Sequence, residues 1–131
     1  MLKTYLEIKM KQQSFTTIST SSLVVKKSKF ESQLYSISTE EDISSIIEHI
    51  KTQHPKATHI CYCTIFNSEV VIKNDREVGN PANIMHNIMF YNHLNSHLLV
   101  TIRYFGGVKL GVGGVMSAFK TCAGECVKNI K

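Results

Sequence analysis

The pattern of apolar and polar residues predicts a pair of strands near the start of the chain. These strands are expected at residues 23–26 and 30–37. In the second, Phe30 and Leu34 fall on one face, opposite Glu31, as in a strand with one buried side.

A helix is expected next. Ser38 and Glu41 have capping-box spacing, which satisfies unpaired backbone donors at a helix start. Pro55 should end the helix, because proline cannot continue it. Between them, isoleucines recur at one-face helical spacing at Ile43, Ile46, Ile47 and Ile50.

The rest of the chain predicts a hairpin, a helix, a buried strand and a last helix. Residues 58–66 and 69–73 are rich in β-branched side chains and flank a turn at Asn67-Ser68. A helix should start at Asn80-Pro81. The apolar run within 97–105 predicts a central strand buried on both faces, and apolar spacing over 112–130 predicts a helix. Together they indicate one α+β domain over residues 21–131, after a polar N-terminal lead-in over residues 1–20.

Composition and charge narrow the class of protein. The chain is 43% hydrophobic and 19% charged, which is typical of a globular protein. No membrane-spanning or secretory segment is apparent, so we expect a cytoplasmic protein without a membrane partner. The net charge of +5 favours polyanionic partners such as RNA or the ribosome.

The cysteines allow two interpretations. One pair would share a strand face and the other a helix face, so four thiolates could converge on zinc. Neither pair has the usual C-x-x-C spacing, and buried free cysteines pack as small apolar side chains. We favour core packing, with no metal and no cofactor, for Cys61, Cys63, Cys122 and Cys126.

The glycine-rich segment Arg103–Gly114 carries the candidate site. Five of the seven glycines lie within nine residues, between a buried strand and a helix. Free amides at a helix start bind anions, and Arg103 and Lys109 would add charge. A tight turn that lets the helix pack on the sheet is the alternative. The phosphate-loop and dinucleotide motifs are both incomplete. The predicted anion or nucleic-acid site comprises Arg103, Tyr104, Phe105, Gly106, Gly107, Lys109, Gly111, Gly113 and Gly114.

Four strings of residues are shared with a known family: Lys26-Lys-Ser-Lys-Phe30, Ala57-Thr-His-Ile-Cys61, Asn74-Asp75 and Arg103-Tyr-Phe-Gly-Gly-Val-Lys-Leu-Gly-Val-Gly-Gly114. They resemble the Impact N-terminal domain family, also described as YigZ-like or uncharacterised protein family 29. The resemblance implies a fold like the second domain of ribosomal protein S5, with a mixed sheet of about four strands and helices on one face. It also implies a role in translation or its regulation.

The family's central loop differs here. It is usually close to D-G-E-P-S-G-T-A-G, whereas residues 75–83 keep Asp75 and Glu77 but lose most glycines. With His59, these two residues are candidates for an accessory part of the site.

Three hypotheses follow. The leading one is an RNA- or ribosome-binding module in translation. The second is a nucleotide- or phosphate-dependent enzyme, with Asp75 or Glu77 holding a cation; the two carboxylates could equally belong to a solvated loop, and no catalytic residue is assigned. The third is a module that binds a protein partner in the stress-response control of translation.

Overall fold

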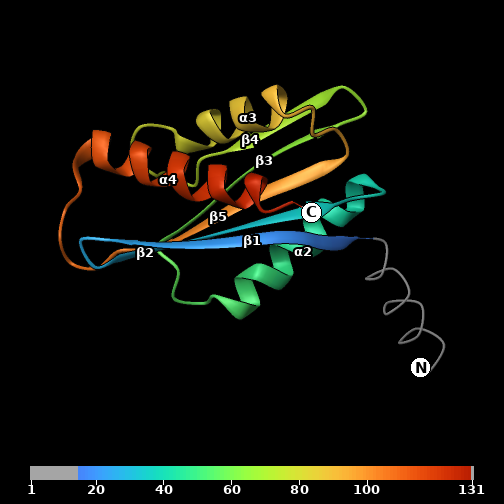
Figure 1. The fold of residues 1–131 in the computed structure, drawn as a ribbon. Coiled ribbons are helices and arrows are strands. Elements are labelled where there is room, and N and C mark those ends of the chain that lie inside the picture. The colour runs from blue at the N-terminus through green and yellow to red at the C-terminus, as the bar shows by residue number, and fades with distance from the viewer. Residues whose placement is uncertain (1–14, 131) are drawn as a thin grey trace, which may run out of the picture.

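The computed structural model describes residues 15–130, which form a five-stranded sheet and three helices (Figure 1). The predicted α+β class is confirmed. In chain order the elements are β1 (Thr16–Val25), β2 (Ser28–Ser36), α2 (Glu40–Gln53), β3 (His59–Phe66), β4 (Glu69–Lys73), α3 (Pro81–Tyr91), β5 (His97–Tyr104) and α4 (Gly111–Lys128).

The sheet has the strand order β1-β2-β5-β3-β4, and every neighbouring pair is antiparallel. The central strand, β5, has six consecutive buried residues, Leu98 to Arg103. Its predicted burial on both faces is therefore confirmed, because helices cover the sheet from either side.

The helices are divided between the two faces of the sheet (Figure 1). α3 and α4 cover one face, where Leu99 joins Met85 and Phe119 in a buried cluster. α2 covers the other, where Leu98 packs with Ile46. Three details implied by the family resemblance are thus corrected. The sheet has five strands rather than about four, its pairs are antiparallel rather than mixed, and helices cover both faces. The helices lie on both faces because β5 carries apolar side chains on both sides, and each face must be covered to exclude water from them.

Two predicted boundaries shift. β1 starts at Thr16, so the strand runs across the expected boundary between the lead-in and the domain. Residues 1–14 of that lead-in lie outside the described residues. The capping box of α2 uses Thr39 and Asp42, one residue later than Ser38 and Glu41. None of the helices within residues 15–130 is long and apolar enough to cross a membrane.

Candidate functional site

The glycine-rich segment connects β5 to α4 at one end of the sheet, beside the turn of the β1–β2 hairpin (Figure 1). The Gly106 N–H donates a 3.3 Å hydrogen bond to the Ser28 hydroxyl. A Cβ on Gly106 would lie only 2.1 Å from the backbone oxygen of Lys27. Glycine is therefore required here by the close approach of two backbones, as the turn interpretation of the sequence expects.

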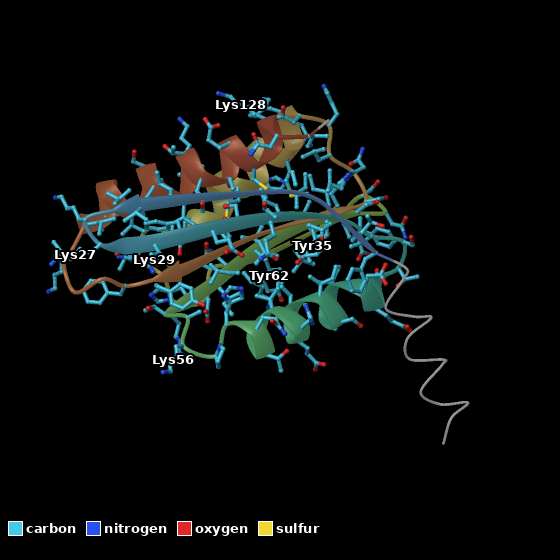
Figure 2. The ribbon with its side chains drawn as sticks, turned by 60° about the horizontal axis from the view of Figure 1, so that its bottom comes forward. Lys27, Lys29, Tyr35, Lys56, Tyr62 and Lys128 are labelled. Atoms are coloured by element: carbon cyan, nitrogen blue, oxygen red, sulfur yellow. The ribbon has the colours of Figure 1, made fainter. Side chains whose placement is uncertain are left out.

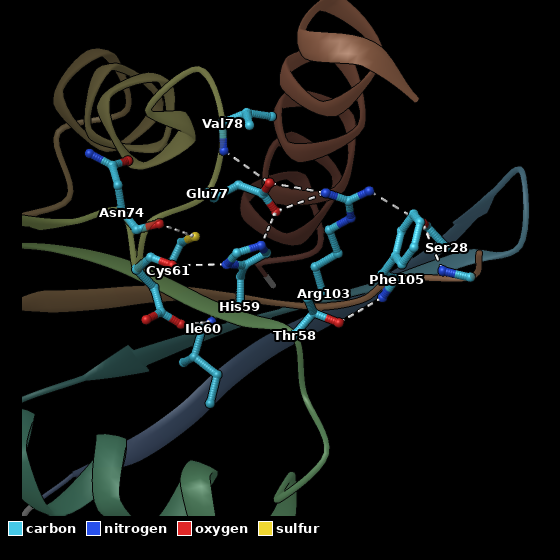
Figure 3. A network of polar contacts seen from close by, with 12 residues as sticks. Ser28, Thr58, His59, Ile60, Cys61, Asn74, Glu77, Val78, Arg103 and Phe105 are labelled. Atoms are coloured by element: carbon cyan, nitrogen blue, oxygen red, sulfur yellow. Dashed lines mark hydrogen bonds and ion pairs between the residues drawn. The ribbon is translucent and has the colours of Figure 1, made fainter. Parts of the chain in front are cut away.

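Arg103 forms a buried ion pair with Glu77 (Figure 3). Its Nη1 lies 3.0 Å from each carboxylate oxygen, and each of the two residues is only 5% exposed. Two buried opposite charges neutralise each other at this distance. The structure thus engages Arg103 internally rather than presenting its charge to an outside anion.

The three accessory candidates meet in the same network (Figure 3). The Nε2 of His59 lies 3.6 Å from the Glu77 carboxylate, and its Nδ1 lies 2.8 Å from the backbone oxygen of Asp75. The Asp75 carboxylate accepts a 2.7 Å hydrogen bond from the backbone N–H of Ile60. Both carboxylates therefore have protein partners. Within residues 15–130, no group of three or more His, Cys, Asp or Glu side chains is arranged to hold a metal ion.

Aromatic rings enclose the Arg103 guanidinium. Its central carbon lies 5.6 Å from the ring centre of Phe30 and 5.7 Å from that of Phe105. Such contacts stabilise a cation against an aromatic face. The Nε of Arg103 is buried and has no hydrogen-bond partner among the described residues.

A cavity of about 450 Å³ lies against this network. Phe105, Val78 and Val112 contribute apolar lining, Lys109 is also at the cavity, and Arg103 contributes buried polar lining. A larger hollow, of about 580 Å³, lies between α3 and α4, but none of the predicted site residues lines it. We therefore take the smaller cavity as the candidate binding site.

The predicted site residues lie in different environments, since several line the cavity and others do not. Tyr104 points to the opposite face of the sheet, where its hydroxyl contacts the Nδ1 of His54. It does not line the cavity. By contrast, Gly107, Gly111 and Gly113 are exposed, with open space where a Cβ would be.

The first turn of α4 has backbone amides available to a ligand. Among residues 15–130, no side chain caps this helix start, and only the Leu110 side chain lies near the position that a Cβ would take on Gly114. Four amides at a helix start have no partner within the helix.

Sequence reasoning identified Lys109 but missed four other lysines at this end of the molecule, and we call the five together the lysine cluster. Lys27 is in the hairpin turn against Gly106, whereas Lys29 pairs with Tyr104 across β2 and β5 and therefore lies on the face of the sheet that α2 covers. Figure 2 shows Lys27, Lys29 and Lys56 at the same end of the molecule, away from Lys128. All five lysines of the cluster are exposed, and none of them forms an ion pair with another described residue. The cluster comprises Lys26, Lys27, Lys29, Lys56 and Lys109.

The four cysteines are free and buried, as the core-packing interpretation expects. They belong to the apolar cluster under α3 and α4. Burial raises the pKa of the Cys61 thiol, and the nearby Glu77 and Asp75 carboxylates raise it further. Burial likewise raises the pKa of Cys63. These thiols are therefore kept protonated, as suits apolar packing.

Comparisons with known proteins agree over most of the chain. The family model described as the Impact N-terminal domain matches residues 26–127. The IMPACT family member YvyE of Bacillus subtilis (strain 168) is 32% identical over 112 residues, which are 82% of this chain and 52% of that protein. The IMPACT family member YigZ of Escherichia coli (strain K12) is 27% identical over 104 residues, 72% of this chain and 50% of that protein. The chain spans about half the length of these relatives.

Two solved structures share the fold. One, described as a hypothetical protein, aligns with a TM-score of 0.77 at 21% identity, covering 89% of this chain and 61% of the other. The second is the two-domain translational regulator Yih1, with a TM-score of 0.50 at 18% identity, covering 88% of this chain and 46% of Yih1. At these identities the similarity concerns the fold alone.

Proposed function

Because the chain belongs to the Impact N-terminal domain family, we propose that it is an RNA-binding module in the control of translation. The lysine cluster and the exposed glycines of the segment form its RNA-contacting surface. One observation carries the proposal: five exposed lysines lie at the end of the molecule that carries the segment, and no described acidic side chain pairs with them.

Unpaired lysines favour binding to a polyanion. Displacing the counterions around phosphate groups is the main source of affinity in sequence-independent RNA binding. Glu77, an acidic side chain that contacts the segment, has its charge compensated by Arg103 within the protein. The surface beside the segment therefore remains positive.

The start of α4 adds a second kind of phosphate contact. Its first turn is exposed at Gly111 and Gly113, and both positions have open space beside the backbone. A helix of 18 residues also directs a partial positive charge to this end. A phosphate between these amides and Lys109 would be bound by charge and by hydrogen bonds.

The link to translation rests on a relative. One solved structure with the same fold, Yih1, is described as a translational regulator. RNA is the polyanion that a protein in translation meets most directly, so the positive surface and the family assignment favour the same partner.

A salt titration tests the proposal. Fluorescence anisotropy should measure the affinity of the chain for a labelled single-stranded RNA at several salt concentrations. We expect the logarithm of affinity to fall linearly with the logarithm of salt concentration, with a slope of about −0.7 for each phosphate contacted. Absence of binding at low salt, or affinity that does not change with salt, would contradict the proposal.

A further inference from the structure

The cavity beside the lysine cluster has features that phosphate binding leaves unused. Three large apolar side chains on it are exposed: Phe105 by 47%, Val78 by 48% and Val112 by 56%. Exposed apolar side chains around a concave site indicate a bound apolar or aromatic group. The volume of about 450 Å³ lies within the range of small-molecule sites, roughly 300–1,000 Å³.

Phe105 is held in place although almost half of its surface is exposed. The Arg103 guanidinium lies against its ring, and the Phe105 N–H donates a 2.9 Å hydrogen bond to the Thr58 hydroxyl (Figure 3). The guanidinium itself is fixed by Glu77. An aromatic ring fixed in this way can stack on another ring with little further loss of conformational freedom.

The cavity also has a polar interior. Arg103 lines it, and the Nε of this buried side chain has no partner among the described residues. Arg103 and Lys109 place hydrogen-bond donors in the lining, so a ligand that carries hydrogen-bond acceptors would be favoured. The edges of nucleobases carry such acceptors, together with an aromatic face.

We propose that this cavity accepts one unstacked nucleobase of a bound RNA strand, which stacks on Phe105 while its phosphates contact the lysine cluster and the start of α4. This inference rests on the proposed function and adds a preference for single-stranded over duplex RNA. In a duplex the bases are already stacked and paired, so none is free to enter the cavity.

The first test compares strand states and two matched phenylalanines. Phe90 on α3 is 61% exposed and does not line the cavity, so Phe90→Ala is the control for Phe105→Ala. Anisotropy should show that Phe105→Ala weakens binding to a single-stranded RNA of about 12 nucleotides by roughly 5- to 150-fold. Phe90→Ala should bind like the unchanged chain. A duplex of the same sequence should bind more weakly than the single strand to Phe90→Ala and to the unchanged chain.

A spectroscopic variant keeps the test decisive if Phe105→Ala folds poorly. The chain contains no tryptophan, so Phe105→Trp would place a single fluorophore at the cavity and Phe90→Trp a single control fluorophore on α3. Single-stranded RNA should quench the first and leave the second unchanged.

Two outcomes would overturn the inference. One is salt-dependent RNA binding without quenching of Phe105→Trp, or with equal affinity for duplex; the proposed RNA function would then stand without the base-binding cavity. The other is equal quenching by adenosine monophosphate and by the oligonucleotide at the same concentration, which would assign the cavity to a free nucleotide. Complete absence of RNA binding would instead remove the proposed function itself.

Discussion

The two halves of the glycine-rich segment have different environments. Residues 103–106 are held by other parts of the chain: Arg103 by Glu77, and Gly106 by Ser28 and the backbone of Lys27. In the second half Leu110 packs against the core, but Gly107, Gly111 and Gly113 are exposed and have no atom within 4 Å of a Cβ position. One continuous motif therefore serves two purposes, since its first half fixes the end of the sheet and its second half exposes backbone.

This division revises the interpretation of Arg103. The sequence predicted it as a ligand for an anion, but the structure engages it with a carboxylate inside the protein. The exposed positive charge comes instead from Lys109 and from lysines of the β1–β2 turn, the start of β2 and the α2–β3 loop.

Breaking the buried pair should have the largest effect. Glu77→Gln leaves the Arg103 charge buried without compensation, which should lower the free energy of unfolding by about 3–5 kcal/mol. Chemical denaturation would measure the loss. Glu69→Gln, on exposed β4, is the matched control and should stay within about 0.5 kcal/mol of the unchanged chain. Equal stability of the two variants would show that the first half of the segment does not depend on the pair.

Replacing one glycine in each half of the segment by alanine should change the free energy of unfolding by smaller amounts and in opposite directions. Gly106→Ala would push a methyl group into the Lys27 backbone, so the free energy of unfolding should fall by about 1–3 kcal/mol. Gly113→Ala meets open space and lies within α4, where alanine is favoured over glycine by up to about 1 kcal/mol.

Thermal or chemical unfolding of both glycine variants measures this contrast. If Gly106→Ala proved as stable as Gly113→Ala, the hairpin would not pack against the segment as described.

Local signals in the sequence predicted most of the elements correctly. The apolar run of β5, the Asn67-Ser68 turn and the Asn80-Pro81 helix start act over a few residues, so each could be found without the fold. The capping box was misplaced because adjacent hydroxyl and acidic residues offer two overlapping pairs, and the structure uses Thr39 with Asp42.

The site was less predictable because it depends on contacts between distant segments. Glu77 and Arg103 are 26 residues apart in the chain, and the pairing of β3 with both β4 and β5 brings the loop after β4 close to Arg103 on β5. The lysines of the β1–β2 turn were visible in the sequence. Their position beside Gly106 follows from the register of β2 with β5, which the sequence pattern does not specify.

The central claim is that the lysine cluster at the glycine segment binds RNA phosphates, and a pair of charge reversals tests it most directly. Lys27→Glu/Lys29→Glu changes the cluster, whereas Lys120→Glu/Lys128→Glu makes the same change in net charge on α4, at exposed positions. The salt dependence of RNA affinity should be measured for both. We predict that the first variant loses about 0.7 of the logarithmic slope for each lysine replaced and binds more weakly, while the second keeps the slope of the unchanged chain. Equal losses in the two variants would contradict the account, because they would show attraction by net charge rather than by this surface.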